Sequence, residues 1–420
     1  MRIALLSTNY DLGGAAVVTR RLCDALRDAG EDARMVVVRP GGYSGAPGQT
    51  PAEVIPKGQW RWPFLRERAE LWLRGVPRKD VFKVSTGKYG VDLPSQPFVQ
   101  QADAVLVNWV SQGFLSLDGF EEILKTGKPV IYTLHDLWAA TALCHLPGEC
   151  RGYCDGSDCR NCPYPGRFGR KLPAEIRELK ARLWSYPNLR LVAVSHWQRD
   201  MALKSPLLKD KQIEVIPHPF PVELYQPGEK VDKEGRRLVV MAAARLDDPV
   251  KDLPAAVDAL NTFAWEYPAD AEGVEFAFVG ELRDDSELKR LRVPYRHLGL
   301  LPPELLRDLY ARATAVISSS KYETMGATLM EGMAAGAIPV SYGDAGQTDI
   351  ITDAVNGFLA PRHDPASLAF ALSLALQTAR MAQPGPAESL ERGLPEFLHN
   401  EVARRFSPAA IAARYLSLLK

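Results

Sequence analysis

The sequence predicts an α/β fold made of two domains, each built around a parallel β-sheet. Three observations predict this class. Short apolar segments alternate with helical segments, first in the N-terminal half and again in the C-terminal half. The apolar segments lack an alternating pattern, as is typical of strands that are covered on both faces of a sheet. A proline-rich passage at residues 215–227 (VIPHPFPVELYQP) separates the two series, and 420 residues are enough for two cores.

The N-terminal half begins with the apolar segment RIALLS, the glycine-containing turn NYDLGGAA and a helical segment. A second strand follows at residues 35–38, and this strand–loop–helix–strand order is a Rossmann-like βαβ unit. Further strands are expected at residues 104–110, 129–135 and 189–195.

The C-terminal half repeats the alternation, with expected strands in RRLVVMAAA, VEFAFVG, RHLGLL, AVISSS and AIPVSYG and helices between them. Residues 406–420 carry apolar side chains at helical spacing. We therefore expect an N-terminal Rossmann-like domain (1–216) and a C-terminal one (217–405) that face a central cleft. A terminal helix (406–420) is expected to pack back on the N-terminal domain.

The composition excludes several classes of function. Fifty-one basic residues balance 51 acidic ones, so no overall field attracts nucleic acid, and we expect no nucleic-acid partner. The N-terminus does not resemble a secretory signal, and no apolar run reaches about 18 residues, so a cytoplasmic protein is expected.

One local patch departs from this balance. Residues 57–88 contain nine basic and three acidic side chains, interleaved with Trp60, Trp62 and Trp72. Such a segment suits peripheral contact with an anionic membrane, here the inner face of the plasma membrane. The alternative is an ordinary helix whose tryptophans pack on the N-terminal domain.

The first chemical motif is the loop RLDDPVK, in which Arg245 and Lys251 follow a predicted strand. Ligands bind α/β sheets at the carboxyl ends of their strands, and an arginine with a lysine suits a diphosphate. The alternative is two solvated charges beside neighbouring aspartates.

The second motif is YETMGATLMEGMAAGAIPV. Glu323 lies in a strand-to-helix loop, Gly326, Ala327 and Thr328 begin the helix, and Glu331 lies within it. Free N–H groups at a helix start can bind phosphate, and a carboxylate further along can accept hydrogen bonds from a ribose. A purely structural role would make Glu323 a partner of the helix dipole and Glu331 an exposed residue, but Glu331 has small and apolar neighbours.

Together these two motifs resemble the donor site of the family-4 glycosyltransferases, which are retaining enzymes of the GT-B fold. The resemblance covers nearly the whole chain, from LSTNYDLGGAAVVTRRLCDAL to DAVNGFLAP. It implies that Arg245 and Lys251 hold the donor diphosphate, that Glu323 lies near the sugar hydroxyls and that Glu331 binds the ribose. The chain departs from the family where many members have Gly-Gly-x-x-Glu, because it reads DAGQTDI with Asp349 near that glutamate's position. This departure leaves the identity of the donor open.

The resemblance also gives roles to residues of the N-terminal half. A Gly-Gly turn and a lone histidine are structural features in most proteins. In the family, a glycine pair like Gly13 and Gly14 approaches the donor phosphates or the acceptor, and a histidine like His135, at the end of PVIYTLH, faces the donor sugar. The implied reaction moves a sugar from a nucleoside-diphosphate sugar to a hydroxyl of a glycan or lipid-linked saccharide, in cell-surface polysaccharide biosynthesis. It proceeds with retention and needs no cofactor or metal for the chemistry.

Five of the six cysteines cluster at residues 144–162, and without an export signal such a cluster favours a metal site over disulfides. Cys159 and Cys162 form a C-x2-C pair, which Cys144 and Cys150 would complete as a closed structural zinc site; His145 or Cys154 could replace a ligand. The insertion resembles that of a family-4 subgroup from exopolysaccharide gene clusters, in which Cys154 would be the extra thiol. We expect the insertion to line the acceptor side. A pair of disulfides is the alternative.

Other classes of protein share parts of this pattern. A nucleotide-sugar epimerase of the same fold, a phosphorylase that carries pyridoxal phosphate, and a non-catalytic sugar-binding relative are the alternatives. The last of these need not keep Arg245, Lys251, Glu323 and Glu331 together.

Overall fold

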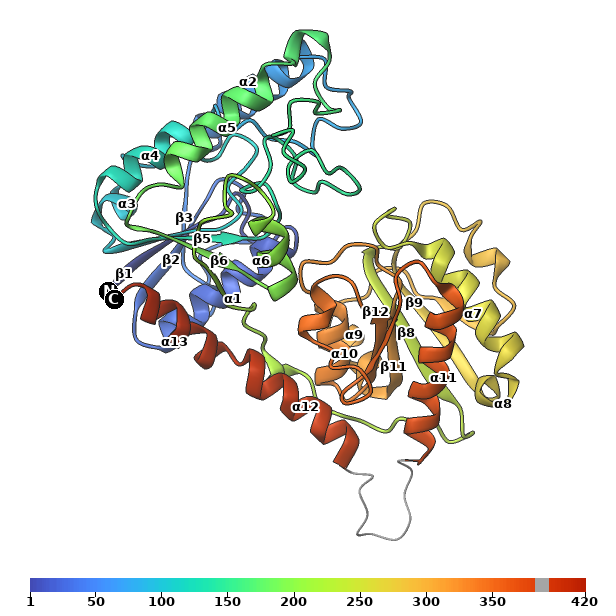
Figure 1. Ribbon diagram of the computed structural model, residues 1–420. Coiled ribbons are helices and arrows are strands. Elements are labelled where there is room, and N and C mark those ends of the chain that lie inside the picture. Colours follow the sequence, from blue (N-terminus) through green and yellow to red (C-terminus); the bar gives the residue numbers. More distant parts are fainter. Residues whose placement is uncertain (382–392) are drawn as a thin grey trace. The chain divides into compact units, whose positions relative to one another are not determined.

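The structure is a computed structural model that describes residues 1–381 and 393–420. The chain divides into two compact units: unit 1 comprises residues 1–219 and 408–420, and unit 2 comprises residues 220–407. Each unit contains one parallel sheet with helices around it (Figure 1). The predicted fold class of two α/β halves with parallel sheets is therefore confirmed.

The sheet of unit 1 has seven strands in the order β3-β2-β1-β4-β5-β6-β7, and all neighbours are parallel. The chain starts in the middle of the sheet, adds strands to one side and then to the other, as in doubly wound folds. The strands are β1 (Arg2–Leu6), β2 (Asp32–Val37), β3 (Ala52–Val54), β4 (Ala104–Val107), β5 (Val130–Leu134), β6 (Leu189–Ala193) and β7 (Ile213–Val215).

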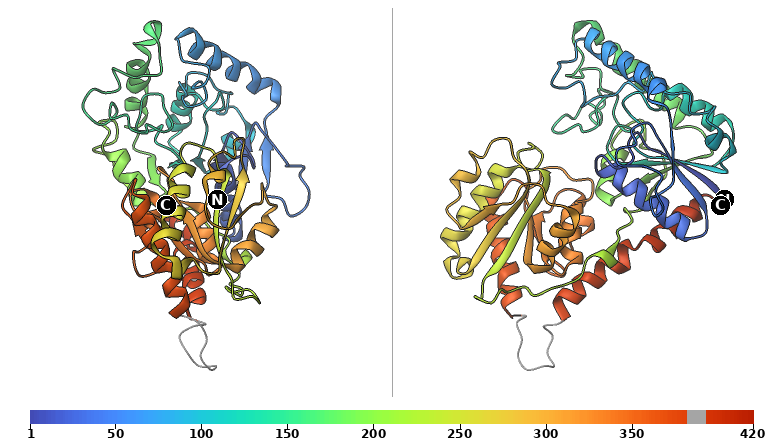
Figure 2. Two further views of the ribbon diagram at one scale, coloured as in Figure 1. Left: turned by 90° about the vertical axis from the view of Figure 1, so that its right-hand side faces the viewer. Right: turned by 180° about the vertical axis from the view of Figure 1, so that it is seen from behind.

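The helices of unit 1 cover both faces of this sheet. They are α1 (Gly14–Asp28), α2 (Lys57–Leu73), α3 (Pro97–Gln101), α4 (Leu117–Lys125), α5 (Leu172–Leu183), α6 (His196–Leu203) and α13 (Pro408–Leu418). α13 packs beside α1 (Figures 1 and 2), where Leu22 and Leu26 meet Ile411 and Tyr415 in one buried core. The Tyr415 hydroxyl also lies 3.1 Å from the hydroxyl of Thr133 in β5.

Unit 2 has a six-stranded parallel sheet in the order β10-β9-β8-β11-β12-β13. Figures 1 and 2 show α9 and α10 on one face and α7 and α11 on the other. The strands are β8 (Arg237–Arg245), β9 (Val274–Glu281), β10 (Tyr295–His297), β11 (Ala313–Ser318), β12 (Ile338–Tyr342) and β13 (Phe358–Ala360). The helices are α7 (Leu253–Glu266), α8 (Pro268–Ala271), α9 (Pro303–Arg312), α10 (Ala327–Ala334), α11 (Pro365–Met381) and α12 (Gly393–Phe406).

The elements differ from the sequence expectation mainly at the edges of the sheets. β3, β7, β10 and β13 are the four outermost strands, and each has only three residues. Three of them were not predicted, because so short a segment carries no readable pattern. At the C-terminus the helix expected over residues 406–420 is α13, which begins at Pro408, and the separate helix α12 ends just before it at Phe406.

α10, which carries the second motif, is held close to its sheet by a glycine. A Cβ atom on Gly332 would lie 2.3 Å from the Cγ1 atom of Val316 in β11, a distance that real atoms do not tolerate. The small residues of the motif are therefore needed for packing as well as for any ligand. No helix in the described part of the chain is long and apolar enough to cross a membrane.

Candidate active site

The two predicted donor motifs meet in unit 2 through one ion pair. The Lys251 ammonium (Nζ) lies 2.5 Å from the Glu323 carboxylate (Oε1), and both side chains are only partly exposed. These residues are 72 positions apart, and each lies beyond the carboxyl end of a strand, β8 or β11. The structure thus brings together two of the residues that the sequence assigned to one site.

The loop with Lys251 is fixed to the end of β11 by hydrogen bonds. The Ser319 hydroxyl donates to the carbonyls of Lys251 (2.8 Å) and Asp252 (3.0 Å). The backbone N–H of Lys321 donates to the carbonyl of Val250 (2.8 Å), and its side chain pairs with Asp252. The loop is consequently held at both strands before any ligand binds, which lowers the ordering cost of binding.

Arg245 is the last residue of β8 and lies in an acidic setting. Its guanidinium is 3.1 Å from Asp247 and 3.6 Å from Asp248, and its side chain is 36% exposed. The register of β8 against β9 shifts between Ala242 and Arg245, and such bulges commonly re-aim a side chain near a functional site. Arg245 is therefore accessible to an anion, which would have to displace the aspartates as partners.

The start of α10 has the geometry that the motif predicts. Gly326 precedes the helix with φ of +96°, a left-handed conformation that favours glycine, and Ala327 and Thr328 form the first turn. The backbone N–H of Gly346 donates to the carbonyl of Glu323 (2.9 Å), and a Cβ atom on Gly346 would lie 2.0 Å from the carbonyl oxygen of Thr324. The segment after β12 is thus packed directly onto the loop that contains Glu323.

Glu331 lies in the second turn of α10, beside the fully buried Tyr310 of α9. Burial raises the pKa of the Tyr310 phenol well above its ordinary value, and the Glu331 carboxylate raises it further. The phenol therefore stays protonated at neutral pH and does not act as a base. Glu331 has small neighbours, with Gly332 and Met333 buried beside it.

Gln347 is a residue of this region that the sequence did not single out. Its side chain is fully buried, and both amide atoms lack a hydrogen-bond partner among the described residues. Its Cβ atom is 3.7 Å from the position that a Cβ atom on Gly326 would take. An unsatisfied buried amide costs about 1–3 kcal/mol, and a catalytic role, an ordered water or a bound ion are the usual reasons for one.

In unit 1 the predicted residues lie at the carboxyl ends of β1 and β5. Gly13 precedes α1 with φ of +89° and ψ of 159°, a conformation suited to glycine, and added side chains at Gly13 or Gly14 would meet open space. His135 follows β5 directly. Its Nε2 atom lies 3.1 Å from Oδ1 of Asn108, which follows the adjacent strand β4, and its ring stacks on that of His218.

Asn108 and His218 were missed by sequence reasoning. A polar residue directly after the strand next to β5 was a usable signal for Asn108, because carboxyl ends of adjacent parallel strands meet at one edge. Nothing in the proline-rich passage marked His218. Arg245, Lys251, Glu323 and Glu331 belong to unit 2, whereas Gly13, Gly14 and His135 belong to unit 1, so the predicted residues are divided between the two units.

Asp136, next to His135, is the centre of a hydrogen-bond network. Its carboxylate accepts from His145 Nδ1 (2.7 Å), Trp109 Nε1 (3.1 Å) and the backbone N–H of Trp138 (2.8 Å). Burial acts to raise the pKa of Asp136, but His145 and these donors outweigh it and hold the pKa below its ordinary value. Asp136 is thus an ionised structural anchor.

All six cysteines are free thiols, so the alternative of two disulfides has no support in the structure. Burial is the main cause that raises the pKa of Cys144 to about 12, and Cys162, Cys159 and Cys150 raise it further. In the described residues, however, no group of three or more His, Cys, Asp or Glu side chains is arranged as metal ligands. The predicted zinc ligands Cys144, Cys150, Cys159 and Cys162 are near one another without forming a coordination site.

Lys180 of α5 holds the loop that leads from β5 to the cysteines. Its ammonium donates to the carbonyls of Trp138 (2.6 Å), Thr141 (3.1 Å) and Ala142 (3.1 Å), and it lies 3.5 Å from the centre of the Trp138 ring. Burial lowers the pKa of Lys180. The three carbonyls and the ring together satisfy the ammonium, so the loop has a defined path.

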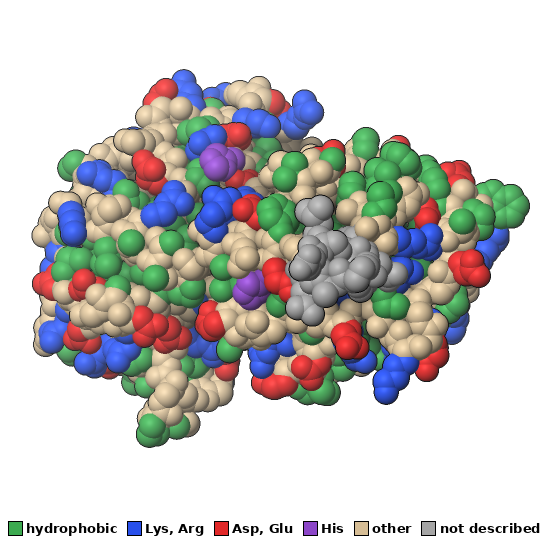
Figure 3. Space-filling view, turned by 90° about the horizontal axis from the view of Figure 1, so that it is seen from below, with side chains coloured by type: hydrophobic (Ala, Val, Ile, Leu, Met, Phe, Trp, Pro, Cys, Tyr) green, Lys and Arg blue, Asp and Glu red, His purple; other side chains and the backbone are tan. Residues whose placement is uncertain are grey.

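Some tryptophans of α2 fit packing on the rest of unit 1, and others fit contact with a membrane. Trp60 is buried and donates to the carbonyl of Gln112 (2.9 Å), whereas Trp62 and Trp72 are 69% and 70% exposed. Leu73 and Phe168 are exposed as well. On the face that Figure 3 displays, basic and acidic side chains are interspersed, in keeping with the balanced composition.

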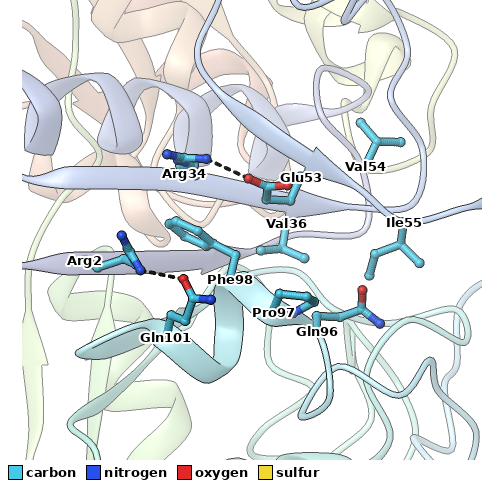
Figure 4. A pocket seen from close by; sticks show the side chains of 10 residues that line it. All are labelled: Arg2, Arg34, Val36, Glu53, Val54, Ile55, Gln96, Pro97, Phe98 and Gln101. Atoms are coloured by element: carbon cyan, nitrogen blue, oxygen red, sulfur yellow. Dashed lines mark hydrogen bonds and ion pairs between the residues drawn. The ribbon is translucent and has the colours of Figure 1, made fainter.

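Two further pockets lie away from these sites. One of about 250 Å³ in unit 1 contains Phe98, with the guanidiniums of Arg2 and Arg34 beside its ring (Figure 4). Arg34 pairs with Glu53 and Arg2 donates to Gln101, so both cations are neutralised or bonded already. The other, of about 240 Å³, lies in unit 2 around Lys230 and Arg237. Neither pocket contains a predicted site residue.

Comparison with known proteins found a family match in the second half of the chain. Residues 237–378 match the family model described as Glycosyl transferases group 1. A curated relative is the D-inositol 3-phosphate glycosyltransferase of Acidothermus cellulolyticus, which is 29% identical over 200 residues. The match spans 43% of this chain and 43% of the relative.

Solved structures resemble the whole chain. HepE of Anabaena in complex with UDP and glucose matches with a TM-score of 0.61 and 15% identity, over 100% of this chain and 99% of that one. Sucrose-phosphate synthase of Thermosynechococcus elongatus matches with a TM-score of 0.62 and 16% identity, over 99% and 97% of the two chains. A glycosyltransferase from Rickettsia africae has a TM-score of 0.63 at 14% identity, over 100% and 97%. At these identities the likeness shows the fold, which is GT-B.

Proposed function

We propose that this protein is a retaining glycosyltransferase that moves a sugar from a nucleoside-diphosphate sugar to a hydroxyl group. The observation that carries the proposal is the Lys251–Glu323 pair beside the start of α10, which puts a cation, a carboxylate and free backbone N–H groups in one place. A diphosphate needs the first and the last of these, and a sugar that develops positive charge needs the second.

In this proposal Arg245, Lys251 and the first turn of α10 stabilise the negative charge that grows on the leaving diphosphate. Because these groups supply positive charge themselves, the chemistry needs no divalent cation. Glu331 accepts hydrogen bonds from the ribose, and Glu323 lies at the sugar, whose hydroxyls and developing charge it can meet. The acceptor attacks from the side of the leaving group, so no protein nucleophile is involved. In unit 1, His135 contacts the sugar, and Gly13 and Gly14 let the backbone approach the donor or the acceptor.

The similar proteins support a proposal about the chemical class of the substrates. HepE was solved with UDP and glucose, and the curated relative is named D-inositol 3-phosphate glycosyltransferase. We propose a nucleoside-diphosphate hexose as donor and a glycan or lipid-linked saccharide as acceptor, within cell-surface polysaccharide biosynthesis.

The test is a panel of nucleoside diphosphates and their sugars, each assayed for thermal stabilisation and then for transfer. A ligand at a hundred times its Kd adds about 2.7 kcal/mol, which is readily measured. Arg245→Ala should abolish the stabilisation, whereas Lys289→Ala, which removes an exposed lysine paired with Asp285 in the same unit, should not. Full transfer by Arg245→Ala would rule the proposal out. Epimerisation of a donor without acceptor would favour the epimerase alternative, and the anomeric configuration of the product tests retention.

We further propose that α2 makes peripheral contact with an anionic membrane, namely the inner, cytoplasmic face of the plasma membrane. The exposed Trp62 and Trp72 and the surrounding basic residues support this. The double variant Trp62→Ser/Trp72→Ser should lose binding to vesicles that contain phosphatidylglycerol. Trp265→Ser, which removes an even more exposed tryptophan from unit 2, is the control. Equal binding by the double variant and the control would contradict the proposal.

Structural zinc at Cys144, Cys150, Cys159 and Cys162 also remains a proposal. The free thiols and their mutual influence on the pKa of Cys144 support it, although their present arrangement is not that of a metal site. Zinc would hold the insertion in one conformation and take no part in the chemistry. Elemental analysis of protein purified without chelators should give one zinc per chain, and less in Cys159→Ser. Wild-type protein that is free of metal would end the proposal.

A further inference from the structure

His135 and His218 form a stacked pair of imidazoles in unit 1. Their ring centres are 5.4 Å apart and the planes differ by 11°. Burial is the main cause that lowers the pKa of His135 to about 4 and holds the pKa of His218 well below its ordinary value. A charge on His135 and the nearby Arg21 both act to lower the pKa of His218 further, while Asp136 opposes the lowering of the pKa of His135. Because Asp136 is already engaged by His145 and two N–H donors, it leaves the imidazole of His135 neutral.

Asn108 decides which nitrogen of His135 carries the proton. Its side chain is buried, and its Nδ2 donates to the carbonyl of Leu106 (3.3 Å). A carbonyl can only accept, so the NH2 group must face Leu106 and Oδ1 must face His135. The Oδ1 atom is 3.1 Å from His135 Nε2, and an oxygen acceptor there requires Nε2–H. In a neutral imidazole the lone pair is then on Nδ1.

We propose that Asn108 and His218 are positioning residues that hold His135 as the neutral Nε2–H tautomer, so that Nδ1 accepts a hydrogen bond from a hydroxyl of the sugar. This inference rests on the proposed function, in which His135 contacts the sugar. It defines the chemistry of that contact: His135 recognises a neutral hydroxyl and contributes no positive charge to the phosphates. The diphosphate is left to the cations of unit 2.

His218 also has a place in the chain that suits a positioning role. It lies between Pro217 and Pro219, at the end of the first segment of unit 1, after which the chain enters unit 2. Each proline fixes its own φ and restricts the residue before it, so the backbone on both sides of His218 is stiff. The backbone N–H of Ile216 donates to the carbonyl of Ala193 in β6, which ties the passage to the sheet. The His218 ring is therefore presented to His135 by a constrained segment.

The first test is nitrogen NMR of histidine-labelled protein, which reports the tautomer without any substrate. The His135 signals are assigned with His135→Gln, and His363→Asn, at an exposed histidine of unit 2, is the control. We expect the Nε2–H form with no titration between about pH 5.5 and pH 8. In Asn108→Leu the two tautomers should mix. In Asn108→Asp the added carboxylate should raise the His135 pKa by about 1–3 units.

The second test is transfer activity with the donor found in the panel above. Asn108→Leu and His218→Ala should lower kcat about ten- to a hundredfold, since small misplacements of a contact group cost that much, with nucleoside diphosphate affinity unchanged. His218→Phe keeps a flat ring and should restore most of the loss. An Nδ1–H tautomer in the wild type, titration of His135 near neutral pH, or equal losses in His218→Phe and His218→Ala would overturn the inference. If the NMR result holds and no donor is turned over, the proposed function has failed and the tautomer assignment stands.

Discussion

The Lys251–Glu323 pair gives the sharpest prediction, because its two members should respond to mutation in opposite ways. Without donor the two side chains neutralise each other over 2.5 Å. In the proposed function, a diphosphate replaces the carboxylate as the partner of Lys251, and Glu323 is released towards the sugar. Lys251→Met should therefore weaken diphosphate binding, whereas Glu323→Gln should leave it unchanged or strengthen it.

The magnitudes follow from the setting of the pair. Both side chains are partly exposed, at 27% and 19%, so the pair itself contributes only about 1 kcal/mol to folding. A hydrogen bond to a charged group contributes about 1.5–3 kcal/mol, so Lys251→Met should weaken the binding of UDP, or of whichever nucleoside diphosphate stabilises the protein most, about 10- to 150-fold. Glu323→Gln should lower kcat about a hundredfold, which corresponds to roughly 2.7 kcal/mol of lost transition-state stabilisation.

The assay is calorimetric titration with the nucleoside diphosphate, followed by initial rates of transfer. Lys289→Met is the control for loss of a lysine. Wild-type affinity in Lys251→Met would refute the assignment of this cation to the diphosphate. Equal weakening in Glu323→Gln and Lys251→Met would show that the pair matters only for the shape of the loop.

Three further predictions concern stability. The pKa of His135 is about 4 in the folded protein and about 6.5 in an unfolded chain, so between these pH values the unfolded state binds more protons. The free energy of unfolding should therefore fall by up to about 3 kcal/mol as the pH drops from 6.5 to 4. Urea midpoints should show a shallower fall with pH in His135→Gln. Gly332→Ala should destabilise unit 2 by about 1–3 kcal/mol, because its Cβ would clash with Val316, and an unchanged melting temperature would contradict the packing argument. Lys180→Met should lower the free energy of unfolding by about 2–4 kcal/mol, because it leaves buried carbonyls without a donor, and proteolysis should then begin in the loop near Trp138. Protease resistance equal to that of the wild type would show that the loop does not need Lys180.

The sequence predicted the central strands well and the outer ones poorly. β1, β5 and β11 are buried at nearly every position, so these segments are mostly apolar and the pattern is readable. β3, β7, β10 and β13 have one neighbour each and three residues, and they exist because a neighbouring backbone pairs with them. Only the assembled sheet provides that neighbour.

The candidate site divides in the same way. By itself the sequence determined the α/β class, the two series of elements, and the positions of Arg245, Lys251, Glu323 and His135 beyond the carboxyl ends of strands, since these depend on local patterns. The tertiary structure alone decided that Lys251 pairs with Glu323 and that Asn108 and His218 flank His135. Those contacts join residues 27 to 83 positions apart. Strand order and register bring such residues together, and neither is encoded in the spacing along the chain.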